Sequence, residues 1–314
     1  MKLRHAAAAL VGSALIAVAA AAPSSSSPSI PSGSARASAL APNTGLAKFS
    51  AAFTLSQAAP EMSPAGANDW TCRPTAAHPR PVVLIHGTWE NAYANWSGLS
   101  PVLKKAGYCV YALNYGAPEG DVFKGRGHVP ESAKEVSAFV DRVLDATGAQ
   151  TADLVGHSQG GGLLPRWYLK FEGGAAKTHR LVGVAPSNHG TTASGMATLA
   201  KSLRVLDTTA QMAGQAAKDQ TIGSDVNARL DAGGDTVPGV RYTTVVTRTD
   251  EVVTPYRQQY LAPGPDAPVE NLDLQDACPI DMSAHLGIAY SEVMYRLVLN
   301  ALDPANARPA SCLG

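Results

Sequence analysis

The stretch Asp153-Leu154-Val155-Gly156-His157-Ser158-Gln159-Gly160-Gly161-Gly162 decides the fold. An apolar run typical of a buried strand ends at Gly156, and a segment with helical character follows from Leu163 to Phe171. The residues from Gly156 to Gly160 match G-x-S-x-G, in which a serine occupies a sharp turn between a strand and a helix. Such a turn needs small residues two places before and after the serine, and both are glycine. We therefore identify Ser158 as the candidate nucleophile.

A glycine-rich turn between a strand and a helix can also serve close packing or phosphate binding. The known phosphate-binding motifs differ, because no Gly-Lys-Ser or Gly-Lys-Thr follows this loop and the stretch has no G-x-G-x-x-G spacing. The nucleophile is therefore the favoured interpretation of these ten residues.

The N-terminal region has the composition of an export signal and a leader. A positively charged start precedes an alanine-rich, uncharged run over residues 6–22, which is too short for a membrane anchor. We expect a signal peptide over residues 1–19. Residues 20–64 are rich in Ser, Pro, Ala and Gly, which predicts a flexible leader or pro-segment, although the apolar part at 47–55 could form a short docked element. We expect residues 65–314 to form one domain.

The charge of the chain bears on its binding partners, and its cysteine content bears on whether it forms disulfides. The chain has 25 Lys and Arg and 25 Asp and Glu, so nothing in its charge indicates a nucleic-acid partner. An even number of cysteines in an exported chain favours disulfides. Four cysteines allow three pairings, and we expect Cys72 with Cys109 and Cys278 with Cys312, because each pair brackets about 35 residues. The cysteines have no C-x-x-C spacing and no calcium-loop pattern is present, so we expect no metal and no cofactor.

Apolar, β-branched runs alternate with helical patterns along the chain. Such alternation is the signature of a parallel sheet, so we expect an α/β fold with a mostly parallel central sheet flanked by helices. A segment at about 190–239 interrupts the alternation, and we expect it to form a lid or cap-like insertion with an acyl-binding wall. The expected strands lie at 81–85, 108–113, 153–156, 180–185 and 242–247, and the expected helices at 99–106, 130–147, 163–171 and 287–302.

The turn after the first strand reads His86-Gly87-Thr88. In hydrolases built on such a sheet, this turn supplies one donor to an oxyanion and the residue after the nucleophile supplies another. Thr88 and Gln159 are therefore the candidate oxyanion-hole residues, and Thr88 could offer its hydroxyl as well as its N–H. We interpret His86 as a packed histidine in a tight turn.

A serine nucleophile needs a base, and the base needs an acid that fixes its tautomer. In this topology the acid follows the serine and the histidine comes last. Asp250 follows the strand 242–247 closely, and we prefer it to the adjacent Glu251 because it is nearer the strand end. His285 is the single histidine beyond Asp250 and is therefore the candidate base.

These motifs resemble the secreted bacterial lipases of class 2 and, more distantly, Candida antarctica lipase B. The resemblance covers residues 72–312 and rests on six motifs: His86-Gly87-Thr88, Asn95-Trp96, Gly156-His157-Ser158-Gln159-Gly160-Gly161, Asn188-His189-Gly190-Thr191-Thr192, Thr249-Asp250-Glu251-Val252-Val253 and His285. It implies an α/β-hydrolase with oxyanion donors at Thr88 and Gln159, and it supports both disulfide pairings. The sequence departs from the family pattern in three places: an extra glycine at Gly162, a proline at Pro165 inside the expected helix, and a weakly matching segment at 193–239. These departures affect the expected shape of the substrate pocket.

The resemblance implies a secreted carboxylic-ester hydrolase, a lipase or esterase with a triad of Ser158, Asp250 and His285 and an acyl-enzyme intermediate. We expect triacylglycerol, other lipid esters or small-molecule esters as substrates, contact with a lipid interface, and a monomer. One alternative is an acyltransferase that uses the same triad. Another is an α/β-hydrolase fold that has no activity and serves as a binding module, because a fold alone does not determine function.

Overall fold

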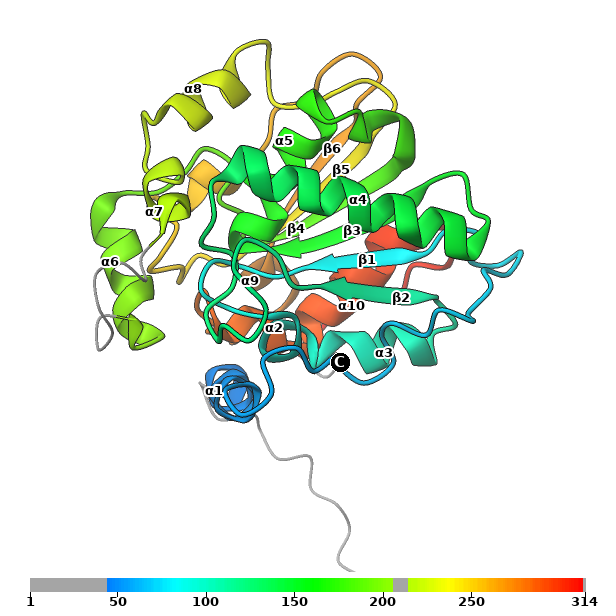
Figure 1. Ribbon diagram of the computed structural model, residues 1–314, viewed down its shortest axis with the longest axis horizontal. Coiled ribbons are helices and arrows are strands. Elements are labelled where there is room, and N and C mark those ends of the chain that lie inside the picture. The colour runs from blue at the N-terminus through cyan, green and yellow to red at the C-terminus, as the bar shows by residue number, and fades with distance from the viewer. Residues whose placement is uncertain (1–43, 206–213, 313–314) are drawn as a thin grey trace, which may run out of the picture. The chain divides into compact units, whose positions relative to one another are not determined.

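A six-stranded parallel sheet forms the centre of the protein (Figure 1). The computed structural model describes residues 44–205 and 214–312. The strands lie in the order β2-β1-β3-β4-β5-β6, and every neighbouring pair is parallel. They are β1 (Val82–Ile85), β2 (Val110–Leu113), β3 (Ala152–His157), β4 (Thr178–Val184), β5 (Arg241–Val246) and β6 (Val269–Asp273).

Helices cover both faces of this sheet (Figure 1). α4 (Val129–Thr147) and α5 (Leu163–Phe171) pack on one face, while α2 (Ala92–Trp96), α3 (Leu99–Lys105) and α10 (Glu292–Leu302) pack on the other. Side chains alternate across a strand, so Val83 and Ile85 join the first cluster and Val82 and Leu84 the second. All four are fully buried, which explains why β1 is apolar throughout.

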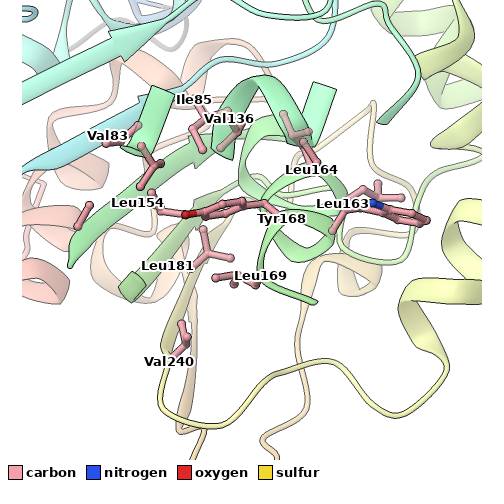
Figure 2. Packing of buried hydrophobic residues seen from close by; sticks show 14 of the residues in the cluster. Val83, Ile85, Val136, Leu154, Leu163, Leu164, Tyr168, Leu169, Leu181 and Val240 are labelled. Atoms are coloured by element: carbon pink, nitrogen blue, oxygen red, sulfur yellow. The ribbon is translucent and has the colours of Figure 1, made fainter. Parts of the chain in front are cut away.

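Figure 2 shows the packing on the α4 and α5 face, where strand and helix side chains interdigitate. Leu154 of β3 and Leu181 of β4 lie beside Tyr168 of α5, and Val136 of α4 joins them. Burying each such side chain contributes about 2 kcal/mol relative to exposure. The same cluster therefore fixes α5, the helix that follows the turn of Ser158.

The structure confirms five of the expected strands and adds one. β6 is an edge strand whose sequence, VENLD, is polar and partly exposed, so it lacks the apolar signal of the inner strands. The helix expected over 287–302 is divided into a 3₁₀ turn at Gly287–Tyr290 and α10. Ser291 separates them because its side chain accepts the N–H of Met294 and so caps α10.

The N-terminal region differs from the expectation of a flexible leader up to residue 64. Residues 44–56 form α1 (Thr44–Ser56), which buries Phe49 and Phe53 against the chain that follows His285 and against α2. Glu61 pairs with the buried Lys124 at 2.5 Å. The segment has few apolar residues, but those at 49, 52 and 53 share one helical face and find partners far along the chain. The expected signal peptide, residues 1–19, and residues 20–43 lie outside the described part.

The expected insertion at 190–239 contains three helices in its described part, α6 (Ala193–Ser202), α7 (Gln215–Asp219) and α8 (Asp225–Asp231). Buried Arg166 of α5 anchors both ends of this insertion. Its guanidinium donates to the carbonyl oxygens of Asn188, before the insertion, and of Leu230, and it pairs with the carboxylates of Asp231 and Asp235. One side chain therefore ties the insertion to the helix that follows the Ser158 turn.

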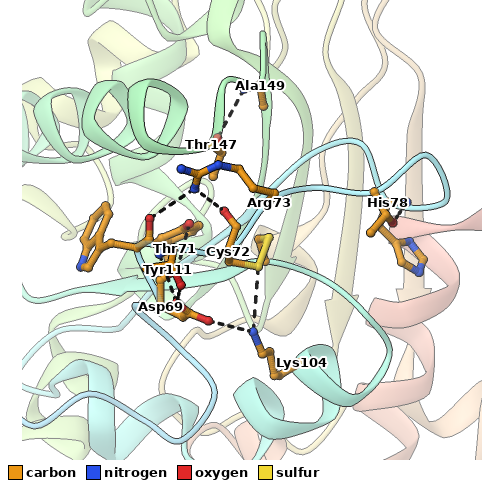
Figure 3. Close-up of a disulfide and its surroundings, with 12 residues drawn as sticks. Asp69, Thr71, Cys72, Arg73, His78, Lys104, Tyr111, Thr147 and Ala149 are labelled. Atoms are coloured by element: carbon orange, nitrogen blue, oxygen red, sulfur yellow. Dashed lines mark hydrogen bonds and ion pairs between the residues drawn. A yellow bond between two sulfur atoms is a disulfide. The ribbon is translucent and has the colours of Figure 1, made fainter.

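Two disulfides join the expected partners, Cys72 with Cys109 and Cys278 with Cys312. Figure 3 shows the first, where Lys104 lies 3.4 Å from Asp69 and 3.9 Å from the Cys72 sulfur, and Arg73 donates to the Cys72 carbonyl oxygen. The second joins the end of the short helix α9 (Leu274–Ala277) to the C-terminal segment beyond α10. None of the helices within residues 44–205 and 214–312 has both the length and the apolar character that crossing a membrane requires.

Replacing either disulfide by paired alanines is expected to lower the melting temperature. The bridged cysteines are 37 and 34 residues apart, and loops of that size correspond to about 4 kcal/mol each in the chain-entropy model. For a domain of this size the loss amounts to about 8 °C or more. Calorimetry of the two double variants measures the effect, and an unchanged melting temperature in both would contradict it.

Candidate active site

The Ser158 turn begins where β3 ends, at the carboxyl edge of the sheet. Ser158 has φ of +55°, a strained value for a residue with a side chain, and it starts a short 3₁₀ turn. A Cβ on Gly156 would lie 1.7 Å from the carbonyl oxygen of Gly160, and a Cβ on Gly160 would lie 2.2 Å from that of His86. The two glycines that define the motif are therefore required by close backbone contact.

The structure brings Ser158, His285 and Asp250 together, although 127 and 35 residues separate the two bonded pairs. The Ser158 hydroxyl lies 2.9 Å from Nε2 of His285 and donates to it. Nδ1–H of the same ring donates to Oδ2 of Asp250, also at 2.9 Å. Ser158 is only 2% exposed and His285 is fully buried. This is the geometry of a serine nucleophile with its base and orienting acid.

Asp250 is held by its own loop. Its Oδ1 accepts the N–H groups of Val252 and Val253 at 2.8 Å each, and its Oδ2 also accepts from Nε2 of Gln259 at 3.0 Å. Burial alone disfavours the charged imidazole, but the Asp250 carboxylate outweighs it, so the pKa of His285 is raised above its ordinary value. The ring is therefore well suited to accept a proton from Ser158.

The competing carboxylates near His285 do not contact its ring. Glu251 is exposed, and its Oε2 accepts the backbone N–H of His285 at 3.2 Å, so it holds the loop. Asp281 accepts the N–H of Ser283 and the hydroxyl of Ser291. Asp250 is thus the one carboxylate bonded to the ring within the described part of the chain.

Thr88 and Gln159 are the candidate oxyanion donors, and their side chains are in contact with each other next to the Ser158 turn. Both are fully buried, and neither backbone N–H has a protein acceptor among the residues that the structure describes. Unpaired buried N–H groups are rare, so this pair is available to an oxygen atom next to Ser158. The Gln159 side chain is fixed separately, because it donates to Gly125 and accepts from the Tyr115 hydroxyl.

Gln220 is a site residue that the sequence did not predict. It follows α7 in the insertion, and its Nε2 donates to the Thr88 hydroxyl at 2.6 Å, while Nε2 of Gln159 donates to the same oxygen at 3.2 Å. A hydroxyl has two lone pairs and one hydrogen, so these two amides leave the Thr88 O–H free to donate. No local motif marks Gln220, because its role depends on how the insertion folds back.

His157 is a second residue whose contact with the site the sequence did not predict. His157 precedes Asp250 in the chain and so does not fit the order expected for the base of a triad, but its Nε2 donates to the carbonyl oxygen of His285 at 2.9 Å, and its ring lies beside the ring of His285. Its position directly before Ser158 was the available signal. His86, in contrast, is a packed histidine as expected: it stacks on Tyr115, and burial lowers its pKa to about 4.

One group of side chains within the described ranges could in principle hold a metal ion. It consists of His189, Asp231 and Asp235, whose ligand atoms lie within 4.8 Å of one another. The guanidinium of Arg166 already pairs with both carboxylates, and both ring nitrogens of His189 have protein partners. These contacts describe an ion-pair cluster that anchors the insertion, so the cluster is not assigned as a metal site.

Part of this sequence is similar to that of two curated lipases. Triacylglycerol lipases of Pseudarthrobacter phenanthrenivorans and Burkholderia plantarii are each 38% identical over 92 residues, which is 27% of this chain and 27% and 24% of theirs. The match thus spans about a quarter of the length of these curated relatives.

Solved structures show the same fold. Aspergillus fumigatus lipase B has a TM-score of 0.61 at 20% identity, over 82% of this chain and 58% of that one. Bacillus licheniformis lipase BlEst2 in its mature form has a TM-score of 0.54 at 15% identity, over 73% of this chain and 94% of that one. Both are α/β-hydrolases. The family model for lipase (class 2) matches residues 79–266, more than half of the chain, and the protein therefore belongs to the class 2 lipase family.

Proposed function

We propose that the protein is a secreted carboxylic-ester hydrolase, a lipase or esterase, that uses Ser158, His285 and Asp250 as its catalytic triad. The observation that carries the proposal is the pair of 2.9 Å hydrogen bonds that His285 makes to Ser158 and Asp250. The family and the fold are those of ester hydrolases. A binding module without activity would have no need for a strained serine that is aligned in this way.

In the acylation step, the Ser158 oxygen attacks the ester carbonyl while Nε2 of His285 takes the hydroxyl proton. Asp250 keeps the ring in the tautomer that can accept this proton and stabilises the imidazolium that forms. His285 then gives the proton to the departing alcohol. Water attacks the resulting acyl-enzyme by the same route, and the acid is released.

The negative oxygen of the tetrahedral intermediate is stabilised by the N–H groups of Thr88 and Gln159. We infer that the Thr88 hydroxyl is a third donor. The reason is that Gln159 and Gln220 occupy both of its lone pairs, as described above, so its hydrogen is directed elsewhere. Gln220 then acts as a positioning residue that orients this hydroxyl.

The proposed substrates are triacylglycerols or other acyl esters at a lipid surface. Ile280 and Met282 are exposed on the segment that leads to His285, and exposed Ile222 follows Gln220 by two residues. These apolar side chains lie close in sequence to site residues and could contact a lipid surface. Secretion is supported by the composition of residues 1–19 and by the two disulfides, which form in oxidising compartments.

The Ser158→Ala variant tests the function. The wild-type protein is expected to hydrolyse p-nitrophenyl esters of some chain length and emulsified triglyceride, and the variant is expected to fold equally well with activity reduced by several orders of magnitude. Release of p-nitrophenol with and without an added alcohol distinguishes hydrolysis from acyl transfer. A variant that hydrolyses esters near the wild-type rate would refute the nucleophile.

The Asp250→Asn variant tests the acid. Because Val252 and Val253 donate to Oδ1, the amide oxygen of the substituted residue should stay there and its NH₂ should face His285. The ring would then carry its proton on Nε2 and could not accept one from Ser158. Turnover at neutral pH should fall by about 10⁴, as in another triad. Glu251→Gln is the matched control, and a larger loss in that variant would contradict the assignment.

The Thr88→Val variant tests the hydroxyl donor. Valine keeps the backbone N–H and the shape of the side chain but removes the O–H, so kcat should fall by about 10- to 1000-fold with little change in KM. Thr88→Ser keeps the hydroxyl and should retain most of the activity. Equal kcat values for the valine and serine variants would exclude a role for the hydroxyl.

A further inference from the structure

Glu90 is a carboxylate that the proposed reaction does not use, and it is fully buried next to the candidate active site. It follows the turn of Thr88. A Cβ built on Gly87 would lie 2.7 Å from Oε1 of Glu90 and 3.0 Å from Cβ of Ser158. The Glu90 carboxylate and the Ser158 side chain therefore both border the space that a side chain at position 87 would fill.

His157 contacts this carboxylate. Both oxygens of Glu90 are 3.3 Å from Nδ1 of His157, and the amide nitrogen of Asn95 lies 3.1 Å from the same atom and donates to it. Oε1 of Glu90 has no other hydrogen-bond partner among the described residues. A carbonyl oxygen can only accept, so Nε2 of His157 carries a proton and donates it to the carbonyl of His285. Glu90, His157 and the main chain of His285 therefore form a continuous series of contacts that does not pass through Asp250.

The rings of His157 and His285 have their centroids 5.0 Å apart, and Glu90 lies against Nδ1 of His157. A buried negative charge is poorly screened, so a carboxylate at this position favours the imidazolium that forms at His285 when Ser158 gives up its proton. Stability is a poor explanation for this carboxylate, because burying a charged group costs free energy.

We propose that Glu90 and His157 are positioning residues for His285: His157 holds its main chain, and Glu90 supplies a second buried negative charge that favours its protonated form. The catalytic meaning of this pair rests on the function proposed above, whereas its effect on the His285 ring does not. Neither residue touches the reacting atoms in this assignment, so neither is counted among the catalytic residues.

Other ionisable groups also face His285, and their effects on its pKa must be distinguished from the effect of Glu90. Among the described residues they are Asp250 and Glu251 on the loop after β5, and His157 at the end of β3. Asp250 is bonded to the ring, and Glu251 is exposed to solvent, which screens its charge. Glu90 is buried, so removing its charge should have a clear effect without breaking the bond between Asp250 and His285.

The test is a pH titration of the histidine rings by NMR in the wild-type protein and in Glu90→Gln, with the His285 resonance assigned from His285→Gln. The substitution keeps the shape of the side chain and removes the charge. The pKa of the His285 ring should fall by about one pH unit. Glu131→Gln, which removes a carboxylate from the exposed surface of α4, is the matched control and should leave this pKa unchanged.

Ester hydrolysis supplies the second readout. The acid limb of kcat/KM against pH should move to lower pH by the same amount in Glu90→Gln, while a purely structural role would lower activity without moving the limb. An unchanged His285 titration in a folded Glu90→Gln protein overturns the inference. If no variant hydrolyses esters but the titration moves, the proposed function fails and the role of Glu90 stands.

If Glu90→Gln does not fold, Glu90→Met tests the same charge. Methionine has a similar length and carries neither a charge nor a hydrogen-bonding group that burial would leave unpaired. The negative charge is lost again, so the pKa of His285 should fall in the same direction. A folded Glu90→Met protein with an unchanged His285 titration would overturn the inference.

Discussion

The turn after β3 is the constraint on which the rest of the site depends. Ser158 can have a positive φ only because the backbone at Gly156 and Gly160 approaches closer than any Cβ would permit. That approach in turn requires β1 and β3 to be parallel neighbours, since the Gly160 segment packs on the carbonyl of His86 at the end of β1. The sheet therefore holds Ser158 in a strained backbone conformation and places its side chain at the carboxyl edge.

The same edge gathers the polar groups around that serine. Parallel strands all end on one side, so the loops after β1, β3 and β5 meet there and carry Thr88, Ser158 and Asp250, while His285 arrives from the segment before α10. Each group is then fixed by a further contact: Asp250 by two backbone N–H groups, and the main chain of His285 by Glu251 and His157. In a buried site these contacts set both the position and the charge preference of the imidazole.

Two segments outside the sheet complete the surroundings. The insertion contacts the Thr88 hydroxyl through Gln220 and is anchored to α5 by Arg166. α1 packs Phe49 against Tyr290, which follows His285 by five residues, and its Ser56 accepts from Asn91 of the turn after β1. The surroundings of the triad are therefore built from parts of the chain that have weak sequence signals and strong tertiary contacts.

The sequence by itself determined the parallel sheet and the pairing of the four cysteines that we expected, and it pointed to the candidate nucleophile and the order of the candidate triad. Each of these depends on local periodicity, on spacing or on a motif whose geometry is nearly fixed. It did not reveal β6 or the contacts of Gln220, Glu90 and His157, and it offered a docked element at 47–55 only as the alternative to a flexible leader. Those features arise from pairings across long sequence separations: His157 and His285 are 128 positions apart, and Thr88 and Gln220 are 132 positions apart. A polar edge strand and a buried carboxylate have no local pattern of their own, and the pattern of a short helix does not show what the helix packs against. Only the tertiary structure decides what each of them contacts.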